Sequence, residues 1–166
     1  MKKRLLSVVL LLTMSLSLLA CGNGGNTGDT NSNGNNNTKE VNAADLAQAL
    51  ATQITYTGEM EQLDAEDVEW YIELEEGVTG IVYEVSGVSS EQVAVFTVPE
   101  KAAADKTIAS INELLADQKD QNAAYDAKVA SRIENAVIMH KGNFVILCVS
   151  DDSAKAKQII KEAFGE

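Results

Sequence analysis

The chain has only two cysteines and one histidine, and the position of the first cysteine gives it a chemical role. Cys21 follows Ala20 at the end of an apolar run over residues 5–19, and Lys2, Lys3 and Arg4 precede that run. A basic head followed by an apolar segment too short to span a bilayer is typical of an export signal. A small residue before a cysteine marks the point where a diacylglycerol thioether is attached and the leader is cut. We therefore expect signal cleavage between Ala20 and Cys21, and lipidation of Cys21 with acyl chains such as palmitate.

Two other interpretations of the leader remain open. It could stay uncleaved as an N-terminal helix on the inner face of the membrane, or it could be an ordinary signal peptide with a chance cysteine. The Gly/Asn-rich residues directly after Cys21 favour lipidation, as does the lack of a second apolar span.

The second cysteine and the histidine offer little further chemistry. Cys148 lies in the apolar run Phe144-Val145-Ile146-Leu147-Cys148-Val149, where a buried thiol acting as a small hydrophobe is expected. His140 stands beside a predicted hairpin turn, which favours an exposed polar role over a general base or a metal ligand. One free cysteine and one histidine do not support a zinc site. We expect no catalytic residue, no metal site and no cofactor.

Carboxylates are the remaining chemical groups, and they occur in two notable places. The first is an acidic cluster formed by Glu59, Glu61, Asp64, Glu66, Asp67 and Glu69. A calcium cage needs ligands at alternating loop positions and a glycine to turn the chain, whereas these acids fit a helix start and its dipole better. The second place is Asp151-Asp152, where helix capping competes with paired acid/base chemistry.

Composition limits the class of protein. The 166 residues include 13 Lys and Arg against 25 Asp and Glu, a net charge of −12. Removal of the leader would leave 10 basic and 25 acidic residues, a net charge of −15. Such a charge argues against nucleic acid and against adhesion to anionic lipid heads. A basic partner, a cation or simple solubility remain compatible with it.

Three segments follow from this pattern: a signal peptide over 1–20, the lipidated cysteine with a Gly/Asn tether over 21–40, and one small domain over 41–166. The tether lacks aliphatic and aromatic residues from 22 to 38, so we expect it to be disordered. As a flexible coil of ~17 residues it reaches about 20–25 Å. The domain would therefore work close to the membrane.

Hydrophobic periodicity predicts the elements of the domain. Helices are expected from Ala43, capped by Asn42; over residues 64–71; from about Ala102 toward Tyr125; over residues 126–132; and after Asp151 or Asp152. Strands are expected over residues 81–85, 93–98, 136–140 and 144–149, and Lys141-Gly142-Asn143 predicts a hairpin between the last two. Two hairpins each followed by a helix predict an α+β fold: a four-stranded, largely antiparallel sheet of two ββα halves, with helices packed on one face and an N-terminal helix before it.

Among the few aromatic residues, Trp70 and Tyr71 are adjacent on the predicted helix over residues 64–71. Such a pair usually covers a core, but it could also border a binding surface. We keep Trp70 and Tyr71 as a possible interaction surface.

From Ser89 onward the chain resembles a family of Gram-positive surface lipoproteins known as domain of unknown function 4358. The resemblance rests on Val93-Ala94-Val95-Phe96 after an acid, Gln118, Tyr125, Ile133, Asn135-Ala136-Val137, Gly142-Asn143-Phe144-Val145, Leu147 and Asp151-Asp152. Residues 63–71 match more loosely. Family members often have an acid where Gln92 stands and a proline where Asp126 stands. The resemblance implies a lipid-anchored domain on the outer face of the cell membrane, and it implies no activity.

Two functions follow as hypotheses. The first is a non-enzymatic binding or accessory module of the cell envelope, anchored through Cys21, which meets another envelope protein or a small ligand. The second is a small envelope hydrolase that uses carboxylates alone, for which Asp151, Asp152 and Glu91 are the obvious candidates.

Overall fold

The computed structural model describes residues 40–87, 89–122, 125 and 127–166. The predicted signal peptide, Cys21 and almost all of the predicted tether lie outside the described residues. The described residues belong to one compact unit. Within the described part of the chain, no helix has the length and apolar character needed to cross a bilayer.

The unit is built on an antiparallel sheet of five strands in the order β1-β2-β3-β5-β4. The strands are β1 (Met60–Gln62), β2 (Thr79–Val85), β3 (Gln92–Thr97), β4 (Val137–Lys141) and β5 (Phe144–Val149). The four predicted strands are confirmed as β2 to β5, so the prediction of a four-stranded sheet was wrong only in omitting β1. That strand is three residues long and lies at the sheet edge beside β2, where it carries almost no hydrophobic signal.

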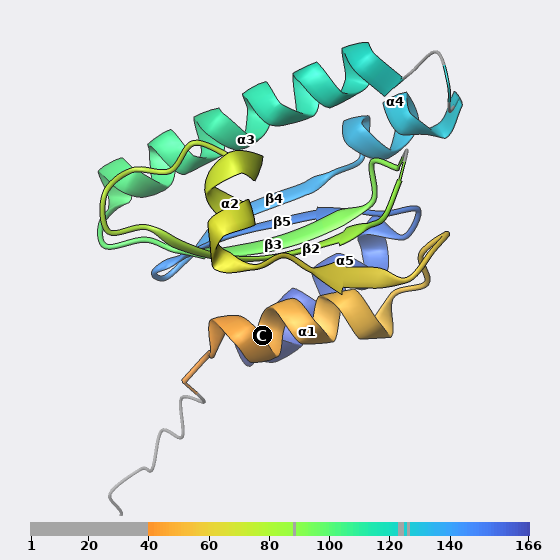
Figure 1. Ribbon diagram of the computed structural model, residues 1–166. Coiled ribbons are helices and arrows are strands. Elements are labelled where there is room, and N and C mark those ends of the chain that lie inside the picture. The colour runs from red at the N-terminus through yellow and green to blue at the C-terminus, as the bar shows by residue number, and fades with distance from the viewer. Residues whose placement is uncertain (1–39, 88, 123–124, 126) are drawn as a thin grey trace, which may run out of the picture. The chain divides into compact units, whose positions relative to one another are not determined.

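The prediction that the helices pack on one face of the sheet was wrong. Figure 1 shows α1 (Ala43–Gln53) and α5 (Ser153–Ala163) below the sheet, and α2 (Ala65–Tyr71) and α3 (Lys101–Asn122) above it. The short α4 (Ala127–Glu134) leads from α3 back to β4. The central strands β3 and β5 account for the second layer of helices. Every residue of β5 is buried, and every residue of β3 except the last. A strand that is apolar on both faces needs cover on both faces.

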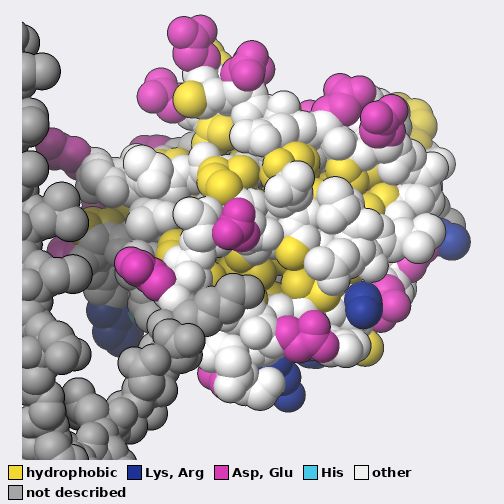
Figure 2. Space-filling model, turned by 90° about the horizontal axis from the view of Figure 1, so that it is seen from below, with side chains coloured by type: hydrophobic (Ala, Val, Ile, Leu, Met, Phe, Trp, Pro, Cys, Tyr) yellow, Lys and Arg dark blue, Asp and Glu magenta, His cyan; other side chains and the backbone are white. Residues whose placement is uncertain are grey.

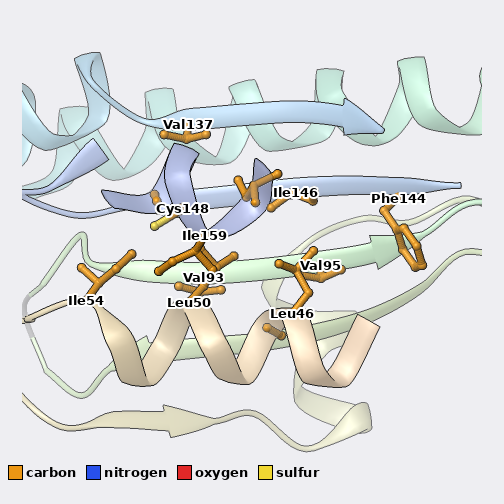
Figure 3. Packing of buried hydrophobic residues seen from close by; sticks show 13 residues of the cluster. Leu46, Leu50, Ile54, Val93, Val95, Val137, Phe144, Ile146, Cys148 and Ile159 are labelled. Atoms are coloured by element: carbon orange, nitrogen blue, oxygen red, sulfur yellow. The ribbon is translucent and has the colours of Figure 1, made fainter. Parts of the chain in front are cut away.

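The lower core lies between the sheet and the two helices α1 and α5. Figure 3 shows Leu46 and Leu50 of α1 pointing toward Val93 and Val95 of β3, with Ile159 of α5 beside them. The predicted cap at Asn42 is confirmed, since its Oδ1 accepts the backbone N–H groups of Ala44 and Asp45 at 2.8 and 3.2 Å. This cap fixes where α1 begins, and so aligns its apolar side with β3.

The upper core holds α2 and α3 against the other face. Val68 of α2 is 4% exposed and packs in one cluster with Val82, Phe96 and Ile111. Gly80 of β2 allows this close packing, because a Cβ there would lie 2.7 Å from the ring of the fully buried Phe96.

The hairpin predicted around Lys141-Gly142-Asn143 is confirmed, with Gly142 and Asn143 between the end of β4 and the start of β5. Gly142 has a φ of +59°, a backbone conformation that glycine adopts without strain. After β5, the side chain of Asp152 accepts the backbone N–H of Lys155 at 2.9 Å and caps α5. The two residues Gly142 and Asp152 thus set the start of β5 and the start of the helix that follows it.

Candidate functional site

Polar and charged side chains gather at one end of the sheet, where β3 begins and β5 ends. We call this group the polar cluster, and define it as Thr57, Ser89, Ser90, Glu91, Gln92, Gln118, Arg132, Ser150 and Asp151. The strand register brings these residues together. Gln92 of β3 pairs with Val149 of β5, so the residues before Gln92 lie close to those after Val149. Thr57 comes from the segment after α1, Gln118 from α3 and Arg132 from α4. The cluster therefore joins both helical layers to the sheet.

Glu91 is the centre of the cluster and is only 1% exposed. Its Oε2 accepts a hydrogen bond from the backbone N–H of Thr57 at 3.1 Å, a second from the Thr57 hydroxyl and a third from the Ser89 hydroxyl at 3.3 Å. A carboxylate is costly to bury unless donors or a cation surround it. These bonds fasten the loop after α1 to the start of β3.

Arg132 supplies the positive charge, and it is 3% exposed. Its Nε donates to Asp151 Oδ1 at 2.8 Å and its Nη2 to Asp151 Oδ2 at 3.3 Å, while Glu91 Oε1 lies 3.8 Å from the same Nε. The two-pronged contact is the strongest geometry an arginine offers a carboxylate. Hydrogen bonding to Arg132 holds the pKa of Asp151 below its usual range, and nearby Lys128 adds to the effect.

Gln92 connects the cluster to α3. Its Nε2 donates to Gln118 Oε1 at 2.6 Å and to the carbonyl oxygen of Ser90 at 3.2 Å. Among the described residues, Ser90 Oγ, Glu91 Oε1 and Gln92 Oε1 are buried without a hydrogen-bond partner. The cluster thus contains more buried hydrogen-bonding capacity than the described chain uses, which is unusual in a folded protein.

This arrangement suits a structural role better than acid/base chemistry. A general acid in glycoside hydrolysis needs a raised pKa, and the pKa of Asp151 is lowered instead. Asp152 is the cap of α5, and Glu91 is buried beneath its donors. Of the two adjacent acids, Asp151 is therefore an ion-pair partner of Arg132, and Asp152 is the cap of α5. A hydrolase activity that uses these carboxylates remains a prediction, and the geometry of Asp151, Asp152 and Glu91 does not favour it.

Cys148 and His140 lie where the sequence predicted. Cys148 is 1% exposed within the lower core, and burial raises the pKa of its thiol. Its Sγ lies 3.8 Å from the Tyr56 hydroxyl and 3.8 Å from Ser150 Oγ. His140 is exposed at the hairpin, with Nε2 3.1 Å from the carbonyl oxygen of Gly142. A raised thiol pKa is the opposite of what a nucleophilic cysteine requires.

The acids between residues 59 and 69 belong to different elements of the fold. Glu61 lies on β1 and Asp67 on α2, while Asp64 precedes α2. Across the residues that the structure describes, no group of three or more His, Cys, Asp or Glu side chains is placed to hold a metal ion. Glu66 and Asp67 lie in the first turn of α2, where the helix dipole favours negative charge.

The two adjacent aromatic residues of α2 point in different directions. Trp70 is 90% exposed, whereas Tyr71 is half-buried and packs against the upper core. The Tyr71 hydroxyl is buried and has no hydrogen-bond partner among the described residues, and burial together with Glu84 raises its pKa. Of these two residues, Trp70 is therefore the one whose ring is open to solvent.

A groove begins beside Trp70 and follows the chain from α2 to β2. We call it the Trp70 groove; its lining consists of Glu69, Trp70, Ile72, Glu73, Leu74, Glu75, Glu76, Gly77 and Val78. A second hollow, which shares Glu73, Leu74 and Glu75, extends to α3 near Lys106. Sequence analysis identified Trp70 but missed the groove, since its walls come from a loop with no periodic pattern.

A different hollow lies on the opposite layer, between α1 and α5. Leu46, Ala49, Ile159 and Ala163 line it, together with acidic residues that include Asp45 and Glu162. Figure 2 shows this face from below, with hydrophobic side chains visible between polar ones and acidic side chains around them. Among the described residues, no exposed aromatic side chain lines this hollow, in contrast to the Trp70 groove.

Comparison with known proteins gives a family but no activity. The sequence profile of the family described as "Domain of unknown function (DUF4358)" matches residues 52–150, more than half of the chain. That span contains both Trp70 and the polar cluster up to Ser150. No curated protein and no solved structure has significant similarity to the chain. The chain belongs to the DUF4358 family, as the resemblance of its β3, α3 and hairpin residues indicated.

Proposed function

We propose that this protein is a lipid-anchored module on the outer face of the cell membrane, and that it binds another envelope component. The observation that carries the proposal is the order of features in the chain. Three basic residues and an apolar run precede Ala20-Cys21, a Gly/Asn-rich segment follows, and a small domain comes after it. A lipid on Cys21 would keep this domain close to the headgroups, since ~17 residues of Gly/Asn-rich composition are expected to have a root-mean-square reach of about 20–25 Å.

Binding is proposed over catalysis because of where the reactive groups lie. Asp151, Asp152 and Cys148 are each engaged in ion pairing, helix capping or core packing. The Trp70 groove, in contrast, leaves a large aromatic side chain exposed beside acidic residues. Exposed aromatic side chains of this size are typical of protein interfaces.

Metabolic labelling in the native cell tests the anchor. Cells that express the full chain, or its Cys21→Ser variant, are grown with a clickable palmitate analogue and then fractionated. The wild-type protein is expected in the membrane fraction, labelled and open to protease added outside the cell. The variant is expected to lose the label and to keep its leader, which intact mass measurement detects. Unlabelled wild-type protein with an intact Met1 terminus would overturn the proposal.

A further inference from the structure

The exposure of Trp70 is the starting observation. It is the only tryptophan in the chain, and 90% of its surface is open to solvent. The helix that carries it is anchored on the other side, where Val68 is 4% and the adjoining Ile72 5% exposed. Trp70 is therefore held outward by a fixed helix. Tryptophan is highly buried in most proteins, so this exposure points to an interaction.

The groove beside Trp70 combines apolar and acidic surface. Ile72 is buried, and Leu74 and Val78 pack against the upper core, so the apolar lining is continuous with that core. The remaining lining is mostly acidic, from Glu69, Glu73, Glu75 and Glu76. Within the described residues, the only cation that pairs with this lining is Lys106, whose Nζ lies 2.8 Å from Glu75 Oε2.

The surface on the β1 side of α2 is acidic as well. Glu61 of β1 and Glu84 of β2 are direct partners in the antiparallel register, an arrangement that places like charges side by side. Burial raises the pKa of Glu84, and the charges of Glu61 and Asp67 raise it further. In the described part of the chain, none of these three carboxylates forms an ion pair. Apart from the pair between Lys106 and Glu75, the negative charge of the groove and of the β1 side of α2 thus has no ion-pair partner among the described residues.

The negative charge of the Trp70 groove distinguishes among the ligands that it could bind. A second copy of this chain would bring its own net charge of −12, or −15 once the leader is removed, and an anionic membrane would be repelled in the same way. A glycan could stack on the indole ring, but it would leave the carboxylates without positive charge. A basic polypeptide uses both features, because Lys and Arg stack on a tryptophan face and also pair with carboxylates.

We propose that the Trp70 groove binds a lysine- or arginine-rich segment of a partner protein. This inference deepens the proposed binding function and rests on it. One basic side chain stacks on the Trp70 ring, while others pair with Glu69, Glu73 and Glu76. Apolar side chains between them contact Leu74 and Val78.

The single tryptophan makes the test direct. The full chain, purified in non-ionic detergent, is titrated with a synthetic Lys/Arg-rich decapeptide while its fluorescence is followed. We expect a saturable change in Trp70 emission, and an affinity that falls at least tenfold between 50 and 500 mM salt, since exposed charges are screened. An acidic decapeptide should change nothing. Unchanged emission with the basic peptide would overturn the proposal.

Variants separate the groove from the general acidity of the protein. By calorimetry, Trp70→Ala and the double variant Glu73→Gln/Glu76→Gln should each weaken peptide binding at least tenfold. The matched control is Asp45→Asn/Glu162→Gln, which removes two charges from the hollow on the opposite layer and should weaken binding less than twofold. Tyr125→Ala removes the other strongly exposed aromatic, 82% exposed, and should also have little effect. Equal losses in the groove and control variants would refute the proposal.

Other occupants are tested on the same protein. Chitin oligosaccharides, phosphatidylglycerol vesicles and the protein itself at high concentration should leave Trp70 emission unchanged. If one of these changes the emission while the basic peptide does not, the occupant proposed here is wrong. The proposed lipid anchor and the proposed peptide binding are tested independently. Palmitate labelling does not depend on Trp70, and the peptide titration does not depend on the lipid.

Discussion

The polar cluster and the surface around Trp70 differ in how their charges are balanced. In the cluster, Asp151 faces Arg132 at 2.8 Å, and its pKa lies below the usual range. Near Trp70, Glu84 faces Glu61 and Asp67, and its pKa lies above the usual range. Charge is compensated within the fold at the first region and left uncompensated at the second. We therefore expect the first region to stabilise the fold, and the second is the region where we propose that a basic partner binds.

The largest effect is expected from Arg132→Met, which leaves Glu91 buried without its cation. Removing one partner of a buried ion pair costs about 3–5 kcal/mol. The loss should appear as a lower urea midpoint for unfolding. Lys119→Met is the matched control, because it breaks the exposed pair with Glu134 at 2.9 Å and should cost less than about 1 kcal/mol. Equal losses in the two variants would show that the cluster does not hold the fold.

A smaller and local loss is expected from Val68→Ala, which removes the buried anchor of α2. Truncating a buried aliphatic side chain of this size costs about 1–3 kcal/mol. Hydrogen exchange should accelerate most in α2 and change least at the start of β3. Acceleration spread evenly over both regions would contradict the separation between them.

Next in size is the loss from Asp151→Asn, which removes a charged acceptor from Arg132. A hydrogen bond to a charged group contributes about 1.5–3 kcal/mol, and the lower end applies because Asp151 is 46% exposed. The lowered pKa also fixes the direction of pH dependence. The contribution of Asp151 is full above the unfolded pKa of about 3.9 and is lost as pH falls through the lower folded value. Urea midpoints measured from neutral pH into this acidic range should therefore decline less steeply for the variant than for the wild type. Parallel curves would argue against the ion pair.

A gain is expected from Glu84→Gln, the counterpart of Asp151 in the second region. Relief of the like-charge pair with Glu61 should stabilise the fold by about 0.5 kcal/mol, since the site is partly screened by solvent. The sign of the pH effect is reversed, because a raised folded pKa means that protonation favours the folded state. Thermal unfolding at neutral pH measures the gain. A loss of stability would mean that Glu84 is compensated after all.

The smallest effect on stability is expected from Trp70→Ala. A side chain that is 90% exposed contributes little to the core, so the free energy of unfolding should change by less than about 0.5 kcal/mol. Circular dichroism during urea unfolding measures this without the lost fluorophore. A loss above 2 kcal/mol would make Trp70 a structural residue and remove the reason for its exposure.

Local patterns predicted the individual elements well. The run of apolar residues over 144–149 and the glycine at 142 define β5 and its hairpin, and Asn42 and Asp152 cap helices as expected. The second helical layer was missed even though β3 is apolar on both faces. The hydrophobic pattern of a strand shows which faces are buried, but it does not show which elements cover them. The edge strand β1 was missed because its three residues pair through backbone bonds and carry no periodic signal.

The polar cluster could not be read from motifs, because Glu91, Arg132 and Asp151 are far apart in the sequence. A signal did exist: Glu91 lies just before a buried strand, and Asp151 lies just after another. If these strands are antiparallel neighbours, the two acids must come to the same end of the sheet. The cation between them, Arg132, comes from α4. Its position depends on how α3 and α4 pack, which no local sequence pattern specifies.

Nuclear magnetic resonance of the ¹⁵N-labelled protein, titrated with the basic decapeptide, compares both regions in one measurement. The indole N–H of Trp70 and the backbone amides of residues 69–78 are expected to shift and saturate together. The amides of Glu91, Arg132 and Asp151 are expected to stay in place. Shifts centred on the polar cluster, with Trp70 unmoved, would contradict the division of roles between the two regions.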